Sequence, residues 1–421
     1  MIRKRSKPGR TGQKSLPAPL TLDILRYSHD GRGIASHAGR VVMVANALPG
    51  EQVVASIDQV GSKLWQGRST SLLNVSPERR EPACKLYGVC GGCQLQHLDH
   101  ASQLQIKQQA VGDHLRRNGF KPQDWSEPLR SEPYGYRHRA RFHIDKQGQV
   151  GFHAEKGNTL IAVSECPVLT PALQQAYEVL VLSAPVIGLV QLELVVDDTG
   201  QVGVVVLDGK PIASANFYQW SARQGWTSSQ ALQYQAGASR VTALAGEFTQ
   251  VNRAVNERMI EQGRQWLQLT ATDRVLDLFC GNGNFSLALA DGVAASLGLE
   301  ASHSAIAQAT YAAQGRPGID FEQSNLFSAD LANMASVQGL APTVVLIDPP
   351  RAGAEALCAA LKRLPSVQKI LYVSCDPATL ARDLNLLAEA KWRIRNIGLI
   401  DMFPQTRHIE TMVYLEKRAK L

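Results

Sequence analysis

The spacing of apolar and polar positions changes near residue 247 and divides the chain into two kinds of pattern. After that point, short and almost wholly apolar runs alternate with longer stretches that have helical spacing. Such runs are typical of strands buried on both faces. Strand followed by helix, repeated, predicts a mostly parallel sheet with helices on both faces over residues 246–421. The expected strands are residues 274–279, 294–299, 344–347, 370–373 and 412–415.

Residues from about 20 to 73 have a different pattern, in which short alternating runs are separated by turn residues. Residues 21–25, 41–44 and 52–57 alternate in this way, with Pro49-Gly50 between the last two. Several short strands at this spacing predict a small OB-like β-barrel over residues 15–75. Barrels of this size often bind RNA or single strands. A β domain without a ligand fits the pattern equally.

The middle of the chain, residues 76–245, is predicted to be an α+β region with mostly antiparallel strands. After its cysteine-containing loop comes a helix over about residues 99–118, where Ala101, Leu104, Val111 and Leu115 fall on one face and Gln and Lys fill the others. An amphipathic helix of this kind docks on another part of the protein, and we expect that part to be the C-terminal domain. Hairpins are expected around residues 145–148 and 198–200.

Three alternating arginines precede the first of these hairpins. On a strand, Arg137, Arg139 and Arg141 would project from one face, next to aromatic residues. A one-sided arginine row suits a phosphate backbone. A solvated strand face accounts for the charges equally well.

Composition adds an expectation about partners. The chain has 421 residues, a net charge of +7 and a pI near 9.0, which favour a polyanionic partner. No apolar run is long enough to cross a bilayer, so no membrane is expected. Residues 1–14 are basic without an apolar stretch behind them, which predicts a disordered tail rather than a secretory signal.

Four of the seven cysteines, Cys84, Cys90, Cys93 and Cys166, are unevenly placed. Without a signal peptide, they predict a cytoplasmic, reducing environment, where clustered cysteines bind metal or do chemistry more often than they form disulfides. Cys90 and Cys93 flank two glycines, and Cys166 precedes proline, a recurrent iron–sulfur ligand pattern. A zinc ion held by four thiolates fits the spacing equally.

Cys375 is the main candidate for catalysis. It follows the strand 370–373, and Asp376-Pro377 opens a helix directly after it. The carboxyl ends of strands are where ligands bind in open α/β sheets. The alternative is a buried structural cysteine, as we infer for Cys280 and Cys358.

Other candidates follow other strands. The turn 280–284 is glycine-rich, and Glu300 lies about 20 residues after it, as in nucleotide-binding sites. The turn lacks the third glycine of a dinucleotide site and has Asp277 beside it, which favours S-adenosylmethionine over NAD.

Three further elements surround this candidate site. Asp348-Pro349-Pro350 would present a carboxylate and carbonyls to a planar base, and Gln250 and Asn252 offer amides, although Asn252 could instead cap a helix. Glu410, just before the last strand, could serve Cys375 as a general base.

Together these motifs resemble the RNA uracil-C5 methyltransferases, and among them the bacterial enzymes that act on 23S rRNA. The resemblance spans nearly the whole chain in the same order. Two positions depart from the family pattern, since Pro350 and Asp376 stand where alanine and asparagine are frequent. The matching motifs are Ser374-Cys375-Asp376-Pro377, Asp348-Pro349-Pro350-Arg351, Phe248-x-Gln250-x-Asn252, His408-Ile409-Glu410 and the four cysteines.

The resemblance implies an N-terminal TRAM barrel, a central domain with a [4Fe-4S] cluster, and a class I, Rossmann-like methyltransferase domain. It implies Cys375 as the nucleophile that adds to C6 of uracil and Glu410 as the base that removes the C5 proton. The cofactor and base pocket would be lined by Gln250, Phe279, Asn284, Glu300, Asn325 and Asp348. The cluster ligands would be Cys84, Cys90, Cys93 and Cys166.

The expected activity is therefore methylation of a 23S rRNA uridine by a cytoplasmic monomer that uses S-adenosylmethionine and acts on neither DNA nor membranes. Three alternatives remain open. The substrate could be a tRNA uridine, Asp-Pro-Pro could serve transfer to a base amine, or the chain could be a non-catalytic RNA-binding assembly factor.

Overall fold

The computed structural model describes residues 16–418 except 29, 122–123, 184–189, 209–216, 222–224 and 229–230. The chain divides into two units. The first comprises the described residues up to Glu81 together with His97–Asp99, and the second comprises Pro82–Gln96 and the chain from His100 onward. No helix in the described ranges is long and apolar enough to cross a membrane.

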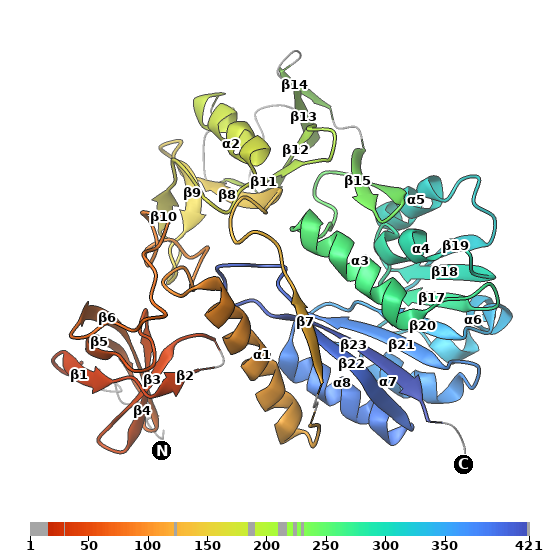
Figure 1. Ribbon diagram of the computed structural model, residues 1–421. Helices are drawn as coiled ribbons and strands as arrows, with labels where there is room; N and C mark the ends of the chain where they lie inside the picture. The colour runs from red at the N-terminus through yellow and green to blue at the C-terminus, as the bar shows by residue number, and fades with distance from the viewer. Residues whose placement is uncertain are drawn as a thin grey trace, which may run out of the picture. The chain divides into compact units, whose positions relative to one another are not determined.

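The first unit is built on a six-stranded sheet in the order β1-β5-β6-β4-β3-β2, which Figure 1 shows as a curled, barrel-like layer. Neighbouring strands are antiparallel except β4 and β6. Its core is small and aliphatic, and Val42, Val44, Val53 and Ala55 have no exposed surface. The strands are Leu20–Asp23 (β1), Arg26–Tyr27 (β2), Gly33–His37 (β3), Arg40–Ala45 (β4), Gln52–Val60 (β5) and Leu64–Leu72 (β6).

In the second unit, α1 (His100–Arg117) comes first, at the position predicted from the apolar spacing. Its buried face differs from the predicted one. Ala101 is exposed, whereas Gln103 and Lys107, which the pattern assigns to polar faces, are buried. Both make hydrogen bonds inside the protein, which offsets the cost of burying polar groups.

The central region holds a seven-stranded antiparallel sheet in the order β10-β9-β8-β11-β12-β13-β14, with α2 (Pro171–Ser183) packed on it. Both predicted hairpins are confirmed, β8–β9 and β11–β12. The strands are Arg139–Ile144 (β8), Val150–His153 (β9), Leu160–Ala162 (β10), Val190–Val196 (β11), Val202–Asp208 (β12), Phe217–Ser221 (β13) and Gly225–Ser228 (β14). A separate hairpin, Leu232–Ala236 (β15) and Ser239–Ala243 (β16), follows.

The C-terminal region contains an eight-stranded sheet in the order β19-β18-β17-β20-β21-β23-β22-β7. The run from β19 to β21 is parallel, which confirms the predicted mostly parallel sheet, and β23 lies antiparallel to β21 and β22. The strands are Arg274–Leu278 (β17), Ala295–Glu300 (β18), Ile319–Gln323 (β19), Val344–Ile347 (β20), Lys369–Ser374 (β21), Trp392–Ile400 (β22) and Glu410–Lys417 (β23). At the far edge, β7 (Trp125–Leu129) pairs with β22 in parallel, an addition that the sequence did not predict.

Helices cover both faces of this sheet (Figure 1). One face packs against α1, α6, α7 and α8, and the other against α3, α4 and the β15–β16 hairpin. Leu380, Leu384 and Leu387 of α8 are almost wholly buried, and each contributes about 2 kcal/mol of transfer free energy. The helices are Arg253–Leu267 (α3), Asn284–Leu289 (α4), His303–Ala312 (α5), Ala335–Leu340 (α6), Glu355–Ala360 (α7) and Pro377–Glu389 (α8), with 3-10 turns at Leu331–Asn333 and Leu361–Arg363.

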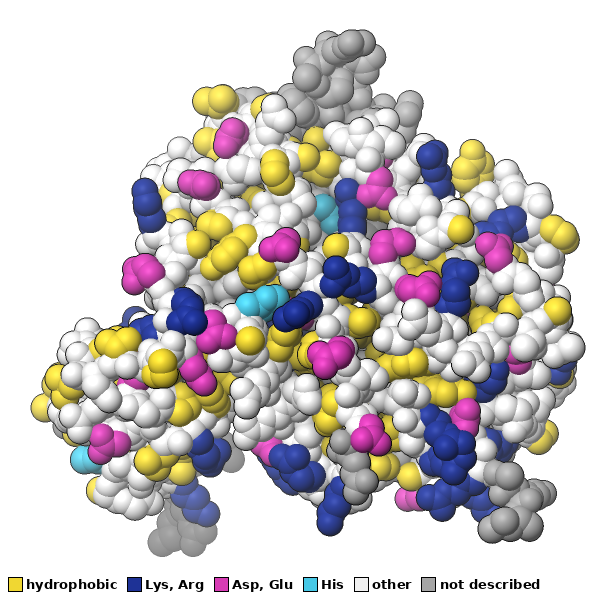
Figure 2. Space-filling model, in the orientation of Figure 1, with side chains coloured by type: hydrophobic (Ala, Val, Ile, Leu, Met, Phe, Trp, Pro, Cys, Tyr) yellow, Lys and Arg dark blue, Asp and Glu magenta, His cyan; other side chains and the backbone are white. Residues whose placement is uncertain are grey.

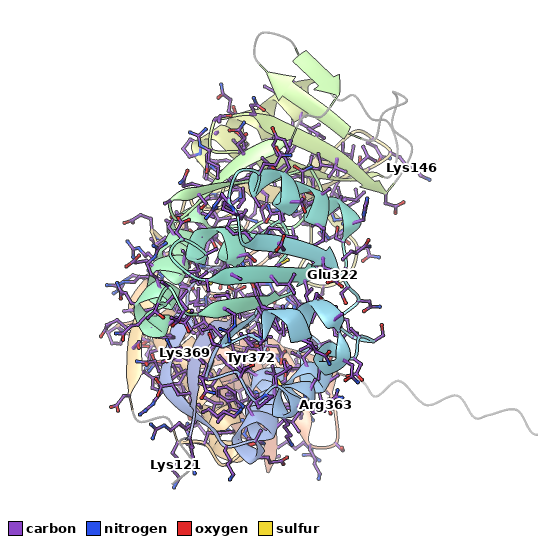
Figure 3. All side chains as sticks on the ribbon, turned by 90° about the vertical axis from the view of Figure 1, so that its right-hand side faces the viewer. Lys121, Lys146, Glu322, Arg363, Lys369 and Tyr372 are labelled. Atoms are coloured by element: carbon purple, nitrogen blue, oxygen red, sulfur yellow. The ribbon has the colours of Figure 1, made fainter. Side chains whose placement is uncertain are left out.

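Side chains on the face drawn in Figure 2 are mixed in type, with basic, acidic and apolar groups interspersed. Figure 3 shows Tyr372 of β21 in the interior and Arg363 at the periphery. The Tyr372 hydroxyl donates a hydrogen bond of 2.6 Å to the buried carboxylate of Asp383. Asp383 also accepts from the backbone N–H of Ala354, so it ties α8 to the loop that follows Asp348.

Candidate active site

Cys375 lies where the sequence analysis expects it, directly after β21 and before α8. Asp376 is the N-cap of α8 and accepts hydrogen bonds of 2.9 Å from the backbone N–H groups of Ala378 and Thr379. Pro377 occupies the first turn, where its missing N–H costs nothing. This strand–turn–helix holds the thiol at the carboxyl end of the sheet.

A cavity of about 1130 Å³ opens at this edge of the sheet. It is lined by residues that follow β17, β18, β19, β20 and β21, together with the start of β23. The cavity walls bring together most of the residues that the sequence analysis singled out, namely Gln250, Phe279, Glu300, Asn325, Asp348, Cys375, Glu410, Cys84, Cys90, Cys93 and Cys166.

The turn after β17 has a backbone that few residues adopt. Phe279 has φ of 64°, a left-handed conformation that is uncommon for an aromatic residue and is frequent at functional sites. Gly283 has φ of 87°, and a Cβ placed there would lie 2.9 Å from Leu287 Cδ1. The turn therefore needs glycine at 283, and it brings the ring of Phe279 to the cavity wall.

Glu300 is oriented by backbone groups around this turn. Its Oε2 accepts from the N–H of Gly281 at 3.3 Å, and its Oε1 accepts from the N–H of Ser302 at 2.9 Å. The carboxylate is thus fixed at the end of β18, beside the glycine turn.

Two further carboxyl groups belong to this edge of the sheet: Asp277 is buried, and Asp348, which lines the cavity, is partly buried. Burial, helped by the neighbouring Asp277, raises the pKa of Asp348 to about 7. Burial likewise raises the pKa of Asp277 to about 7, although the hydroxyl of Ser286 donates to Asp277 Oδ2 at 2.5 Å. Gln250 Nε2 lies 3.5 Å from Asp348 Oδ2, so one amide of the predicted pair faces this carboxyl.

The charge of Glu410 acts on Cys375, and both residues line the cavity. Burial, together with the charges of Glu410 and Asp348, raises the pKa of the Cys375 thiol to about 11, and Arg351 acts against this rise. Burial and the charge of Asp348 raise the pKa of Glu410 to about 8, and Lys107 opposes that rise. Glu410 Oε2 is buried and has no hydrogen-bond partner within the described ranges. An unpaired carboxyl oxygen in the same cavity as a thiol is suited to proton transfer.

Two asparagines take local structural roles. Asn252 is the N-cap of α3, accepting from the N–H of Val255, which is the capping alternative considered for it. Asn284, at the start of α4, exchanges side-chain hydrogen bonds of 2.9 and 3.0 Å with Asn256. Asn284 does not line the cavity, so the structure does not bring it together with the other predicted pocket residues.

An ion pair buries the middle residue of the arginine row. Arg139 is buried and its guanidinium binds Glu193, while Arg141 is exposed and contacts the same carboxylate. Arg137 precedes β8 and donates to the backbone carbonyl of Arg139. The three arginines share one face, as expected, since all of them line the cavity, but only Arg141 is exposed, because Glu193 on the neighbouring strand draws Arg139 into the interior.

The four clustered cysteines line one wall of the cavity, and all are free thiols. Burial raises the pKa of Cys93 to about 12 and that of Cys166 to about 11, and the neighbouring cysteines add to both increases. The N–H of Gly92 faces Cys90 Sγ at 3.4 Å. Cys84, Cys90 and Cys166 all act on the charge of Cys93, so the four thiols are near neighbours and form a donor set that fits a thiolate-bound cluster. Within the described residues, no three His, Cys, Asp or Glu side chains converge on a single-ion site.

Some residues that line the cavity or act on it were not predicted from the sequence. Phe327 lines it and lies with its ring centroid 5.6 Å from that of Phe279. Its position two residues after Asn325, beyond the end of β19, is the signal that could have identified it. Lys107 and Asp401 do not line the cavity, but their charges act on Glu410; no sequence signal pairs them, because they are 294 residues apart.

Comparison with known proteins agrees with this geometry. Residues 229–418 match the tRNA (Uracil-5-)-methyltransferase family. The solved structure of Pyrococcus abyssi tRNA (uracil-54, C5)-methyltransferase in complex with S-adenosyl-L-homocysteine superposes with a TM-score of 0.72, covering 94% of this chain and 100% of that one at 23% identity. That similarity defines a shared fold.

Curated relatives match over nearly the whole chain. The 23S rRNA (uracil(1939)-C(5))-methyltransferase RlmD of Pseudomonas putida is 36% identical, covering 99% of this chain and all of the relative. The enzyme of the same name from Pseudoalteromonas translucida is 37% identical over 95% of this chain and 96% of its own. The chain therefore belongs to the RNA uracil-C5 methyltransferase family.

Proposed function

We propose that this protein methylates C5 of a uridine in 23S rRNA, using S-adenosylmethionine and a transient covalent bond between Cys375 and C6 of the base. The observation that carries the proposal is that the thiol of Cys375 and the unpaired carboxyl oxygen of Glu410 meet in one cavity. The choice of RNA rests on the names of the full-length relatives.

The charge of the cavity supports a cationic methyl donor. Asp277, Asp348, Glu410 and Cys375 all have raised pKa values, because burial and mutual repulsion disfavour their charged forms. A positively charged ligand would stabilise those charged forms. S-adenosylmethionine supplies a positively charged sulfonium that carries an electrophilic methyl group.

The residues proposed to hold the donor and the base are those that follow the strands. Glu300, fixed by two backbone N–H groups, is placed to accept hydrogen bonds from ribose hydroxyls. Phe279 offers an aromatic surface, Asn325 an amide, and Asp348 with Gln250 a polar pair for a planar base. Asn284 remains a prediction, and its amide is engaged by Asn256.

C5 of uracil is a poor nucleophile, and in the proposed mechanism Cys375 makes it a better one. The thiolate adds to C6 of uracil, and the electron pair of the C5–C6 double bond makes C5 nucleophilic. C5 would take up the methyl group as the S–CH3 bond of the sulfonium breaks and its electron pair stays on sulfur, so that neutral S-adenosylhomocysteine leaves. Glu410 would then remove the remaining C5 proton. The C5–C6 double bond re-forms as the C6–S bond breaks, and the thiolate leaves. One difficult substitution is thereby divided into easier steps.

The uridine must leave its stack to reach this chemistry. A cavity of about 1130 Å³ that is lined by both the donor residues and Cys375 has room for a nucleoside beside the donor. Base flipping is the route by which enzymes bring a stacked base into such a pocket.

We further propose that Cys84, Cys90, Cys93 and Cys166 bind a [4Fe-4S] cluster, which the four grouped thiols and the family resemblance support. No step of the proposed reaction needs an electron, so we assign the cluster a structural role. Anaerobically purified protein should contain iron and acid-labile sulfide, and Cys166→Ser should lose both. Stoichiometric zinc without sulfide would contradict this assignment.

We also propose the domain organisation expected from the sequence: a basic tail at 1–14, a TRAM-like barrel at 15–75, a cluster domain at 76–245 and a methyltransferase domain at 246–421. A monomer in the cytoplasm is proposed with it, because nucleic acid is the only macromolecular partner that this chemistry requires.

The test is a methylation assay on defined RNAs. Purified protein would be incubated with labelled S-adenosylmethionine and either a 23S rRNA fragment or tRNA, followed by nuclease digestion and mass spectrometry of the nucleosides. We expect 5-methyluridine in the rRNA. Label found only in tRNA would mean that the substrate is tRNA and not 23S rRNA. A methylated amino group on a base would contradict the C5 chemistry.

A further inference from the structure

The segment that carries Glu410 toward the cavity is held by residues from a distant part of the sequence. Residues 401–409 join β22 to β23, and Glu410 is the first residue of β23. Asp401, Gln405 and Thr406 are almost wholly buried in this loop. Because Glu410 directly follows this loop, the position of the loop sets the position of the Glu410 carboxyl.

A buried ion pair fixes the start of the loop. Lys107 of α1 donates to Asp401 Oδ1 at 2.7 Å and to the backbone carbonyl of Phe403 at 3.0 Å. The Lys107 side chain is 2% exposed and that of Asp401 is fully buried. His100 Nε2 lies 2.7 Å from the other oxygen of Asp401. Because a buried charge is costly without its partner, removing Lys107 would free this part of the loop.

A pair of glutamines fixes the middle of the loop. Gln103, one turn before Lys107, donates to Gln405 Oε1 at 3.1 Å and accepts from the backbone N–H of Gln405 at 3.0 Å. Gln405 has φ of 68°, a left-handed conformation that needs such support. The carbonyl of Gln405 also accepts from the N–H groups of Gln94 and Leu95, directly after Cys93.

We propose that Lys107 and Gln103 are positioning residues for Glu410: through Asp401 and Gln405 they hold the 401–409 loop so that the Glu410 carboxyl reaches the C5 proton. This inference rests on the proposed function and adds to it the part of the protein that serves the proton-removal step. It assigns a task in catalysis to a helix that lies outside the methyltransferase sequence pattern.

Adduct formation and release depend on different residues, so displacing Glu410 should slow one step and not the other. Adduct formation needs the Cys375 thiolate, whereas release needs Glu410 to take the C5 proton so that the C6–S bond can break. A displaced Glu410 would slow release and leave methylated RNA bound to Cys375. The loss would fall on the second half of the reaction.

The charged groups around Glu410 add a pH signature. Asp348 and Asp401 raise its pKa and Lys107 lowers it, while the Cys375 thiol shares the cavity with it. His100 and Arg351 act on the same groups through Asp401 and Cys375. Loss of the Lys107 charge should therefore move the acid limb of the release rate to higher pH.

The test compares Lys107→Met and Gln103→Met with Arg116→Met, an exposed cation of the same helix that pairs with Asp113. Single-turnover reactions with a 23S rRNA fragment and S-adenosylmethionine would be quenched over time and resolved on denaturing gels. For both positioning variants we expect methylated RNA to accumulate as a covalent adduct, with release slowed by at least about tenfold and adduct formation by less than about threefold. Arg116→Met should behave as wild type.

Two outcomes would overturn the proposal. If release and adduct formation are slowed by the same factor, the two residues have a general structural role. If neither rate changes relative to wild type, they have no role in the reaction. If Lys107→Met fails to fold, the neutral Gln103→Met variant decides between these outcomes. Failure of the proposed function is distinguishable, because wild-type protein would then form neither adduct nor 5-methyluridine.

Discussion

Replacing Glu410 with glutamine should stabilise the folded protein, and increasingly so as the pH rises. Burial and the neighbouring Asp348 raise the pKa of Glu410 to about 8 from an ordinary value near 4.5. The unfolded chain therefore ionises Glu410 more easily than the folded protein does. The free energy of unfolding of the wild-type protein therefore falls as the pH rises from about 4.5 to about 8. Glutamine has nearly the same shape and never ionises.

The size of the effect follows from the pKa difference. One pKa unit corresponds to about 1.4 kcal/mol, so ionising Glu410 in the folded state costs at most about 5 kcal/mol. Part of this cost is repulsion with Asp348, which can hold the proton instead. We therefore expect Glu410→Gln to stabilise the protein by about 2–3 kcal/mol above pH 8 and by little below pH 5.

Thermal unfolding of the ligand-free protein at about pH 5 and about pH 9 measures this difference. The gain in Tm of Glu410→Gln over wild type should be larger at the higher pH by about 4–6 °C, since 1 kcal/mol corresponds to about 2 °C. Glu389→Gln, an exposed carboxylate on α8, is the matched control and should give the same Tm difference at both pH values. A Glu410→Gln difference that does not depend on pH would refute the electrostatic reasoning.

Three other substitutions test particular features of the fold. Gly283→Ala should lower the free energy of unfolding by about 1–2 kcal/mol, because φ at Gly283 is positive and Leu287 is close. It should also weaken S-adenosylmethionine binding measured by calorimetry. Gly339→Ala, where the added methyl group meets open space, is the control and should bind normally. Arg139→Met should lower the free energy of unfolding in urea by about 3 kcal/mol by leaving Glu193 buried without its main partner, and adding Glu193→Met should recover part of the loss. Tyr372→Phe should cost about 1–2 kcal/mol through its lost bond to Asp383 while methyl transfer continues, and loss of transfer at unchanged stability would contradict that assignment.

The parts of the fold that the sequence predicted are those that depend on neighbouring residues. The α8 start is encoded locally, because Asp376 and Pro377 supply the cap and the first turn that end the strand before Cys375. The glycine turn is local as well, since positive φ at Gly283 follows from its lack of a side chain. These local signals placed Cys375, Glu300 and Asp348 at one edge of the sheet.

The parts that the sequence did not predict depend on partners far along the chain. Nothing in the sequence near Lys107 indicates that this lysine will form a buried ion pair with Asp401. Likewise, nothing near Arg139 identifies Glu193 as its partner. The pairing of β7 with β22 joins segments that are separated by most of the second unit. Helical periodicity assigns Lys107 to a polar face, because the pattern registers polarity and not the hydrogen bonds that make a polar residue tolerable inside.

Trapping the reaction with 5-fluorouridine tests the covalent mechanism most directly. Fluorine at C5 cannot leave as a proton, so Glu410 cannot complete the reaction once Cys375 has added and C5 has been methylated. A 23S rRNA fragment carrying 5-fluorouridine, incubated with the protein and S-adenosylmethionine, should give a methylated RNA–protein adduct that survives denaturation and maps by mass spectrometry to Cys375. Cys375→Ala should give none. Efficient methylation of normal RNA by Cys375→Ala, or an adduct on another residue, would contradict the account.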